Sequence, residues 1–268
     1  MVLGVLGGCG PAAGAHFYTR LIELTDATAD REHIDVLLTG RATTPDRTAA
    51  LTGGGVSPAA CLVADAHFLA AGGADLLVLL CHTAHAYLSE LRAAVRVPIL
   101  DMVSLVVDTA AAQGITRLGI LSTEGTRRAR LYERAAAEYG MRILYPPAPA
   151  WEGVQTLIYG YLKQGRGDGG AALRTACAAL AAGGCEGISL SCTELSLPAA
   201  GAPARLFRWS APPGALCRLP LYDPIELLCR RVIPLCGKKL KAEKEDSPYA
   251  PWRFAVRPAR RPPAGGGF

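Results

Sequence analysis

The chain has 268 residues, half of them hydrophobic, which is enough for one large or two modest domains with well-filled cores. No apolar stretch approaches the roughly 18 to 20 residues that a membrane helix needs, which argues against a membrane protein. Nine cysteines occur without a CxxC pair, a pattern that favours free thiols in a reducing compartment over disulfides. We therefore expect a globular cytoplasmic protein.

The net charge of +5 is confined to the C-terminal end. Residues 238–268 contain eight Lys or Arg and three Asp or Glu, whereas the first 237 residues contain 20 of each sign. The same segment carries five prolines and ends in PPAGGGF, a composition that buries too little apolar surface to offset chain entropy. We expect residues 238–268 to form a disordered basic tail. Because few aromatic residues accompany the charge, we expect no nucleic-acid partner.

Seven short apolar runs alternate with helix-like stretches over residues 1–205. This alternation is typical of βαβ units around a parallel sheet. The runs are apolar at nearly every position, as in strands that helices cover on both faces. They are VLGVLG (2–7), IDVLLTG (34–40), ADLLVLLC (74–81), VPILD (97–101), RLGILS (117–122), RILYP (142–146) and GISLSC (187–192).

Two pairs of segments repeat at nearly the same spacing. GGADLLVLLCHT (72–83) matches GGCEGISLSCTE (183–194) at an offset of 111 residues, and LGVLGGCG (3–10) matches LGILSTEG (118–125) at an offset of 115. The chain is therefore predicted to be duplicated, as an α/β protein of two pseudo-symmetric parallel-sheet domains. We expect the first domain over 1–98, completed by about 208–237, and the second over 99–207.

Two cysteines end matching strands, Cys81 in the first predicted domain and Cys192 in the second. Open parallel sheets bind ligands beyond the carboxyl ends of their strands, so we expect both thiols to face an active site in the cleft between the domains. The start of the following helix favours a thiolate. Two opposed thiols can invert a carbon acid, because one removes the α-proton and the other returns a proton to the opposite face. Thr83 and Thr193 are placed to stabilise the developing enediolate.

A set of motifs in a fixed order makes this prediction more specific. They are GGCGP (7–11), PDRT (45–48), SP (57–58), CHTAH (81–85), TEGT (123–126), IYGYLKQG (158–165), CTEL (192–195) and YDP (222–224). Over roughly residues 1–235 the chain resembles the aspartate/glutamate racemase family. The resemblance implies racemisation of an amino acid, with aspartate or glutamate as the expected substrate, by two cysteines and without a cofactor. It also implies a homodimer.

Individual residues receive roles from the same resemblance. Cys81 and Cys192 correspond to the paired acid and base. Arg47 and Lys163 are similar to the cations that hold the distal carboxylate of the substrate. Contacts to the α-carboxylate and amino groups are implied for Thr83, Thr123 and Thr193.

Three positions depart from the family pattern, and we expect all of them to line or back the substrate pocket. Ser191 stands where a glycine usually precedes the second cysteine. His82 stands where the family usually has an asparagine, and Cys9 stands where methionine is frequent. An imidazole can still donate a hydrogen bond, and if protonated it would favour a thiolate at Cys81. We hypothesise that His82 shifts the substrate preference or the pH optimum, with loss of activity as the competing outcome.

Cofactor and metal chemistry fit the sequence less well. Lys163 is the only lysine before residue 238, so a pyridoxal phosphate Schiff base would have to use it, and its surroundings offer no phosphate cup. A zinc site at Cys81, His82 and His85 would need adjacent ligands, which is poor tetrahedral geometry. We expect neither group. A solvated surface lysine is the alternative for Lys163.

Rival interpretations remain at the second cysteine and for the reaction itself. Glu194 is either a proton partner of Cys192 or an ordinary acid in the first turn of a helix. The same architecture would also suit a decarboxylase or a cis–trans isomerase. A relative that binds an amino acid without turning it over is the third possibility, motivated by His82 and by the Pro-rich segment 204–220.

Overall fold

The computed structural model describes residues 1–165, 170–199 and 219–242. Most of the basic tail and most of the Pro-rich segment 204–220 lie outside the described residues. None of the described helices is long and apolar enough to cross a membrane. The cytoplasmic location stays a prediction.

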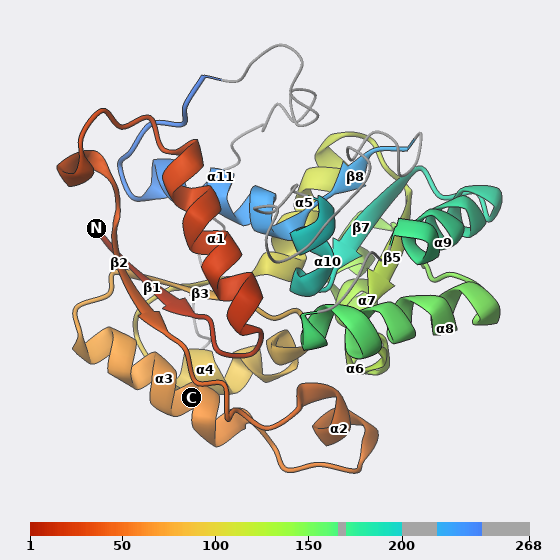
Figure 1. Ribbon diagram of the computed structural model, residues 1–268, viewed down its shortest axis with the longest axis horizontal. Coiled ribbons are helices and arrows are strands. Elements are labelled where there is room, and N and C mark those ends of the chain that lie inside the picture. The colour runs from red at the N-terminus through yellow and green to blue at the C-terminus, as the bar shows by residue number, and fades with distance from the viewer. Residues whose placement is uncertain (166–169, 200–218, 243–268) are drawn as a thin grey trace.

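Two separate four-stranded parallel sheets form the centre of the described chain, which confirms the predicted α/β class (Figure 1). The first sheet has the strand order β2-β1-β3-β4 and the second β6-β5-β7-β8, so the two halves share one topology. The strands are β1 (Val2–Leu6), β2 (Asp35–Thr39), β3 (Leu76–Leu79), β4 (Ile99–Leu100), β5 (Arg117–Ser122), β6 (Arg142–Leu144), β7 (Gly187–Ser191) and β8 (Leu221–Tyr222). Each of the seven predicted runs contains a strand, and β8 falls outside them.

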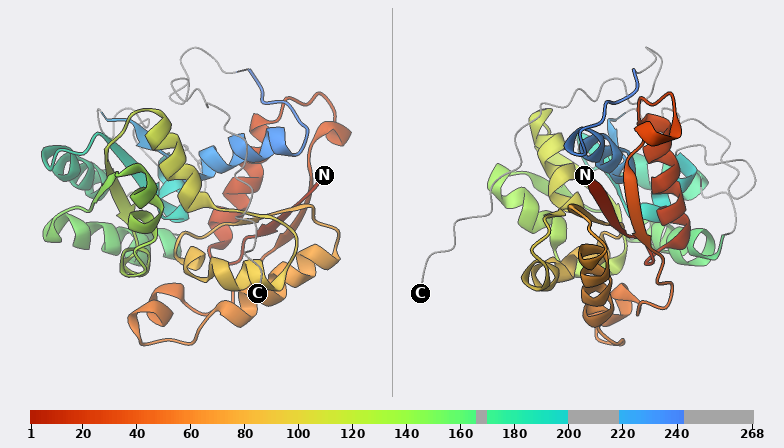
Figure 2. Two further views of the ribbon diagram at one scale, coloured as in Figure 1. Left: turned by 180° about the vertical axis from the view of Figure 1, so that it is seen from behind. Right: turned by 90° about the vertical axis from the view of Figure 1, so that its left-hand side faces the viewer.

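Helices cover both faces of each sheet (Figures 1 and 2). On the first sheet, α1 and α11 pack on one face and α3 and α4 on the other. On the second, α8 and α9 pack on one face and α5 and α7 on the other. The α-helices are α1 (Pro11–Leu24), α2 (Arg47–Thr52), α3 (Ala59–Ala71), α4 (Leu88–Ala94), α5 (Met102–Ala112), α6 (Glu124–Arg128), α7 (Leu131–Ala136), α8 (Ala148–Thr156), α9 (Gly170–Ala182), α10 (Thr193–Ala199) and α11 (Pro224–Leu235). Shorter helical turns are η1 (Asp30–Glu32), η2 (Thr83–Tyr87), η3 (Ala137–Tyr139), the π-helical η4 (Leu157–Tyr161) and η5 (Leu162–Gln164).

The duplication extends to an acid that does the same work in both halves. Asp75 precedes β3, and its carboxylate accepts the backbone N–H of Val2 at 2.7 Å. Glu186 precedes β7, and its carboxylate accepts the N–H groups of Thr116 at 2.7 Å and Arg117 at 3.1 Å. Each acid therefore anchors the start of the neighbouring central strand.

The helix that follows the last strand of each sheet crosses to the other half. β4 pairs with β3, and α5 then packs against the second sheet. β8 pairs with β7, and α11 then packs largely against the first sheet. The first sheet thus extends to Leu100, beyond the boundary expected at residue 98. The segment expected to complete the first domain is divided, because β8 joins the second sheet. Strands of two residues are too short for hydrophobic periodicity to assign.

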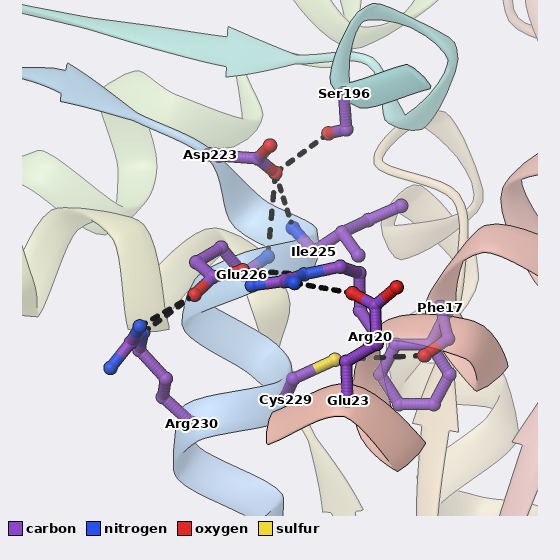
Figure 3. A network of polar contacts seen from close by, with 9 residues as sticks. All are labelled: Phe17, Arg20, Glu23, Ser196, Asp223, Ile225, Glu226, Cys229 and Arg230. Carbon is purple, nitrogen blue, oxygen red and sulfur yellow. Dashed lines mark hydrogen bonds and ion pairs between the residues drawn. The ribbon is translucent and has the colours of Figure 1, made fainter. Parts of the chain in front are cut away.

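A buried polar network holds α11 against helices of both halves (Figure 3). Asp223 caps the start of α11 and also accepts the hydroxyl of Ser196 on α10 at 2.7 Å. Glu226, in the first turn of α11, pairs with Arg20 of α1 at 2.7 Å. Because α10 begins directly after Cys192, this network fixes the helix that follows the second cysteine.

The beginning of the expected tail belongs to the fold. Residues 239–241 run beside residues 24–26 at the end of α1, where the Asp26 N–H donates to the Lys239 carbonyl at 2.9 Å. Leu240 packs against the apolar cluster that the first sheet forms with α1 and α11. Residues 239–241 therefore do not belong to the disordered tail expected from residue 238, because their backbone groups find partners. Residues 243–268 lie outside the described chain.

Candidate active site

A narrow cavity lies between the two halves, beyond the carboxyl ends of the central strands. Its empty volume is about 280 Å³. The first half contributes Asp46, Arg47, Thr48, Cys81, His82 and Thr83, and the second contributes Thr123, Tyr159, Lys163, Cys192, Thr193 and Glu194. Both cysteines therefore share one cavity. Each lies just past a strand instead of ending it, since β3 stops at Leu79 and β7 at Ser191.

Cys81 lies in a cationic part of this cavity. A hydrogen bond from Cys9 is the main cause that lowers the pKa of Cys81, burial opposes it, and the charges of Arg47 and Lys163 lower it further. The same bond and burial raise the pKa of Cys9. Cys81 is therefore the thiolate of the pair and Cys9 the thiol.

Arg47 is the first residue of α2, and its guanidinium donates hydrogen bonds to backbone carbonyls. Its Nη1 donates to the carbonyls of Thr44 at 3.2 Å and Pro45 at 3.1 Å, and its Nη2 donates to that of Cys9 at 2.6 Å. Its Nε is buried and has no partner among the described residues. Arg47 thus ties the loop before α2 to the turn after β1, and it keeps one donor without an acceptor.

Cys192 lies in an acidic part of the cavity. Its Sγ donates to Oε2 of Glu194 at 3.0 Å. Burial raises the pKa of Cys192 well above its ordinary value, and the charge of Glu194 raises it further. Burial also acts to raise the pKa of Glu194, but the charge of Lys163 and hydrogen bonds from Cys192 and Lys163 outweigh it and lower the pKa. Cys192 is therefore a thiol that faces a carboxylate.

Lys163 connects this acid to the cavity. Its Nζ lies 3.1 Å from Oε1 of Glu194, and its side chain is only 24 % exposed. Burial opposes the charged form, but the charge of Glu194 raises the pKa of Lys163 overall. An ammonium group has three donors, so the contact with Glu194 leaves two for a ligand.

Three buried threonine hydroxyls meet across the boundary between the halves. Thr83 Oγ1 lies 2.8 Å from Thr123 Oγ1 and 3.0 Å from Thr126 Oγ1, and the last two are 3.1 Å apart. Each hydroxyl can donate or accept, so the cluster can turn its protons toward an anionic ligand. Thr193 lies on the other side, where its hydroxyl donates to Glu194 at 3.2 Å.

Tyr159 bridges the two halves at the cavity. Its hydroxyl donates to Thr48 Oγ1 of α2 at 2.6 Å, and the Nζ of Lys163 lies 5.7 Å from its ring centroid. Burial raises the pKa of Tyr159 to about 12, so the phenol keeps its proton. This contact closes the cavity between α2 and η4.

The rings of the two histidines that follow Cys81 both contact other residues of the protein. His85 Nδ1 lies 2.8 Å from the Cys81 carbonyl, and Nε2 accepts the N–H of Met102 at 3.1 Å, so neither nitrogen is open to a metal. The His82 ring stacks on Tyr132 with centroids 6.0 Å apart, and both of its nitrogens are buried without a partner among the described residues. Burial lowers the pKa of His82 well below its ordinary value. His82 is therefore neutral, which corrects the idea that a charged imidazole supports the Cys81 thiolate.

The duplicated halves thus bring two thiols of opposite protonation to one cavity. The sequence model of the Asp/Glu/hydantoin racemase family matches residues 6–232. The chain belongs to this family. All eight sequence motifs that carry the resemblance fall inside the matched range.

Solved structures of racemases share the fold of this family member. The aspartate racemase of Picrophilus torridus is 25 % identical with a TM-score of 0.74, over 93 % of this chain and 99 % of that one. An aspartate racemase homologue from Pyrococcus horikoshii OT3 is 20 % identical with a TM-score of 0.67, over 88 % and 98 %. A glutamate racemase from Francisella tularensis subsp. tularensis SCHU S4, solved with D-glutamate, is 14 % identical with a TM-score of 0.60, over 88 % and 80 %. The last two similarities concern the fold alone.

Within this racemase fold, eight of the nine predicted site residues line the cavity, and Cys9 is the exception. Its side chain lies behind Cys81 instead of on the wall. Sequence reasoning missed Asp46, Thr48 and Tyr159, which belong to the PDRT and IYGYLKQG motifs and also line the cavity. Membership of those motifs was the signal that pointed to them.

Proposed function

We propose that this racemase-family protein interconverts the enantiomers of an acidic amino acid without a cofactor, with Cys81 and Cys192 as paired base and acid. The observation that carries the proposal is the opposite protonation of two thiols that line one cavity, one from each half of the chain. Inversion at a carbon acid needs a base on one face and an acid on the other, and this pair supplies both.

The proton balance closes over one turnover. The Cys81 thiolate takes the α-hydrogen as a proton, and the electron pair left on Cα delocalises into the α-carboxylate. The Cys192 thiol then gives its proton to the opposite face of Cα. Cys81 ends as a thiol and Cys192 as a thiolate, which is the starting state for the reverse reaction. The hydroxyls of Thr83 and Thr123 are the candidates to donate to the enediolate oxygens.

The charges around the cavity favour a substrate with a second carboxylate. Within the described part of the chain, the contact with Glu194 leaves Lys163 two further donors, and the buried Nε of Arg47 has no acceptor. Because the most similar structure described above is an aspartate racemase, aspartate is the first candidate and glutamate the second.

Hydrogen exchange at Cα tests the proposal directly. Purified full-length protein with reduced thiols and no added cofactor is incubated in deuterated water with either enantiomer of aspartate, glutamate or alanine. We expect loss of the α-proton signal together with the appearance of the opposite enantiomer for aspartate or glutamate. The double variant Cys81→Ser, Cys192→Ser is the control. Absence of exchange with every amino acid would overturn the proposal.

The rival reactions give different products in the same design. A decarboxylase would release carbon dioxide from malonate-like acids, and a cis–trans isomerase would convert maleate-like acids. A binding protein would show a ligand-dependent rise in melting temperature with aspartate but no deuterium incorporation.

A further inference from the structure

Cys9 stands outside the cavity wall but beside the first thiol. β1 and β3 are neighbouring parallel strands with Leu6 opposite Leu79, and the N–H of Leu80 donates to the Leu6 carbonyl at 3.0 Å. The turn that follows β1 therefore runs alongside residues 80–82. This register places Cys9 near Cys81, and the two side chains pack against the same apolar cluster.

Two close contacts fix the direction of this turn. A Cβ at Gly8 would lie 2.3 Å from the backbone N of Arg41, and one at Gly10 would lie 2.6 Å from Oε1 of Glu194. Only glycine fits at either place without a shift of these neighbours. Cys9 lies between them, so its backbone is held alongside residues 80–82.

The position of each sulfur relative to the cavity distinguishes the two cysteines. The guanidinium of Arg47 binds Cys9 through the backbone carbonyl at 2.6 Å, and its charge acts on both thiols. The charged groups that act on Cys81 are Arg47 from α2, Lys163 from η5 and Glu194 from α10. Of the two sulfurs, only that of Cys81 lines the cavity where a substrate would present its proton, so Cys81 is the acceptor and the Cys9 thiol is the donor.

We propose that Cys9 is a positioning residue whose thiol donates a hydrogen bond to the Cys81 sulfur and so keeps Cys81 ready to accept a proton. Its role in turnover rests on the proposed function, but the hydrogen bond itself can be tested without a substrate. A methionine would fill similar space without an S–H group, and a serine would restore a donor. These two replacements separate donation from packing.

The test measures the pH dependence of alkylation at Cys81. Cleavage after arginine and lysine releases residues 48–92 as one peptide, which contains both Cys61 and Cys81. In a Cys61→Ser background, Cys81 is therefore the only thiol of that peptide. Proteins of this background with Cys9, Cys9→Met, Cys9→Ala or Cys9→Ser are treated with iodoacetamide from about pH 4 to about pH 10, and the Cys81 peptide is quantified by mass spectrometry. A second measurement needs no reagent to enter the cavity. The ultraviolet absorbance of thiolate is recorded across the acid pH range, and the signal of the matching Cys81→Ser protein is subtracted to give the midpoint of Cys81.

With Cys9 present, we expect a midpoint near pH 5. Loss of the donor in Cys9→Met and Cys9→Ala should raise the midpoint by about one pH unit or more, which slows alkylation about tenfold below the midpoint. Cys9→Ser should stay closer to the parent. Equal midpoints in the parent, Cys9→Met and Cys9→Ala would overturn the inference.

Racemisation provides the second readout. The acid limb of kcat/KM should move upward with the alkylation midpoint in Cys9→Met and Cys9→Ala, whereas a packing defect would lower kcat without moving that limb. If no amino acid is racemised, the proposed function fails while the alkylation midpoints still decide the hydrogen bond. The two failures are therefore distinguishable.

Discussion

The two cysteine centres occupy matching places in the duplicated halves but have opposite chemistry. The Cys81 sulfur has a hydrogen bond with the Cys9 thiol and lies near the cations Arg47 and Lys163, and these contacts lower its pKa. The Cys192 thiol donates a hydrogen bond to the Glu194 carboxylate, and burial together with the charge of Glu194 raises the pKa of Cys192. The repeat thus supplies position, and the neighbouring side chains supply proton affinity.

The contact between the halves shows the same division. A Cβ at Gly10 would lie 2.6 Å from Oε1 of Glu194, and one at Gly125 would lie 2.7 Å from Cγ2 of Thr83. Gly10 matches Gly125 in one repeat, and Thr83 matches Glu194 at the offset of 111 residues in the other. The backbone contact is therefore duplicated, while a carboxylate stands on one side and a hydroxyl on the other.

Single replacement of each cysteine tests this division most severely. Cys81→Ser and Cys192→Ser should each reduce racemisation by about 10²- to 10⁴-fold, the range for a positioned acid or base. Each variant keeps one thiol, so each should still exchange the α-hydrogen of one enantiomer without inversion, and the two variants should prefer opposite enantiomers. Deuterium incorporation followed by chiral chromatography measures both effects. Exchange of the same enantiomer by both variants would contradict the arrangement of thiols on opposite faces.

Removal of the carboxylate should make the second centre more like the first. In Glu194→Gln, Cys192 loses an anionic acceptor and its pKa should fall, so we expect kcat to drop by about 10²-fold. Lys163 loses its anionic partner, and the KM for aspartate should fall. Steady-state kinetics measure both constants. Glu186→Gln is the matched control, because Glu186 anchors β5 away from the cavity, and an equal kcat loss in both variants would contradict a local role for Glu194.

The pH profile reports the difference between the two thiols in the unaltered protein. The lowered pKa of Cys81 means that its thiolate persists down to about pH 5, and kcat/KM should fall about tenfold per pH unit below that value. The raised pKa of Cys192 keeps its thiol protonated above the ordinary value of 9.0, so no loss is expected from this group at neutral pH. The two enantiomers must share one kcat/KM profile, because they have equal free energy in water. An acid limb near the ordinary thiol pKa would remove the contrast between the centres.

The sequence predicts which residues line this site better than it predicts which side chains contact one another there. The repeat and the motifs identify both cysteines, the cations and the threonines of the cavity wall, because strand ends and motif order are properties of the chain itself. The Lys163 to Glu194 pair and the Tyr159 to Thr48 bridge depend on how elements far apart in the sequence pack together, and no periodicity encodes that packing. The same limit explains why the side chain of Cys9 could not be placed behind Cys81.

A smaller effect is expected from the bridge between the halves. Tyr159→Phe removes the 2.6 Å hydrogen bond to Thr48 and should lower the free energy of unfolding by about 1 kcal/mol. Thermal or denaturant unfolding measures the loss. Tyr161→Phe is the control, because Tyr161 is 46 % exposed. If Tyr159→Phe and Thr48→Val lower stability independently, with an additive double variant, the bridge contributes nothing.

The smallest effect on the pH profile is expected at His82, although it directly follows Cys81. Its pKa is lowered by burial and by His85, so the ring is neutral wherever the Cys81 thiolate exists and its protonation cannot tune that thiolate. His82→Asn should therefore leave the acid limb of kcat/KM in place, in contrast to Cys9→Met, while loss of the stacked ring beside Tyr132 lowers stability. The pH dependence of kcat/KM and the melting temperature measure the two effects. A shift of the acid limb in His82→Asn as large as that in Cys9→Met would mean that charge next to Cys81 in the sequence, and not the thiol across the strands, sets the first centre.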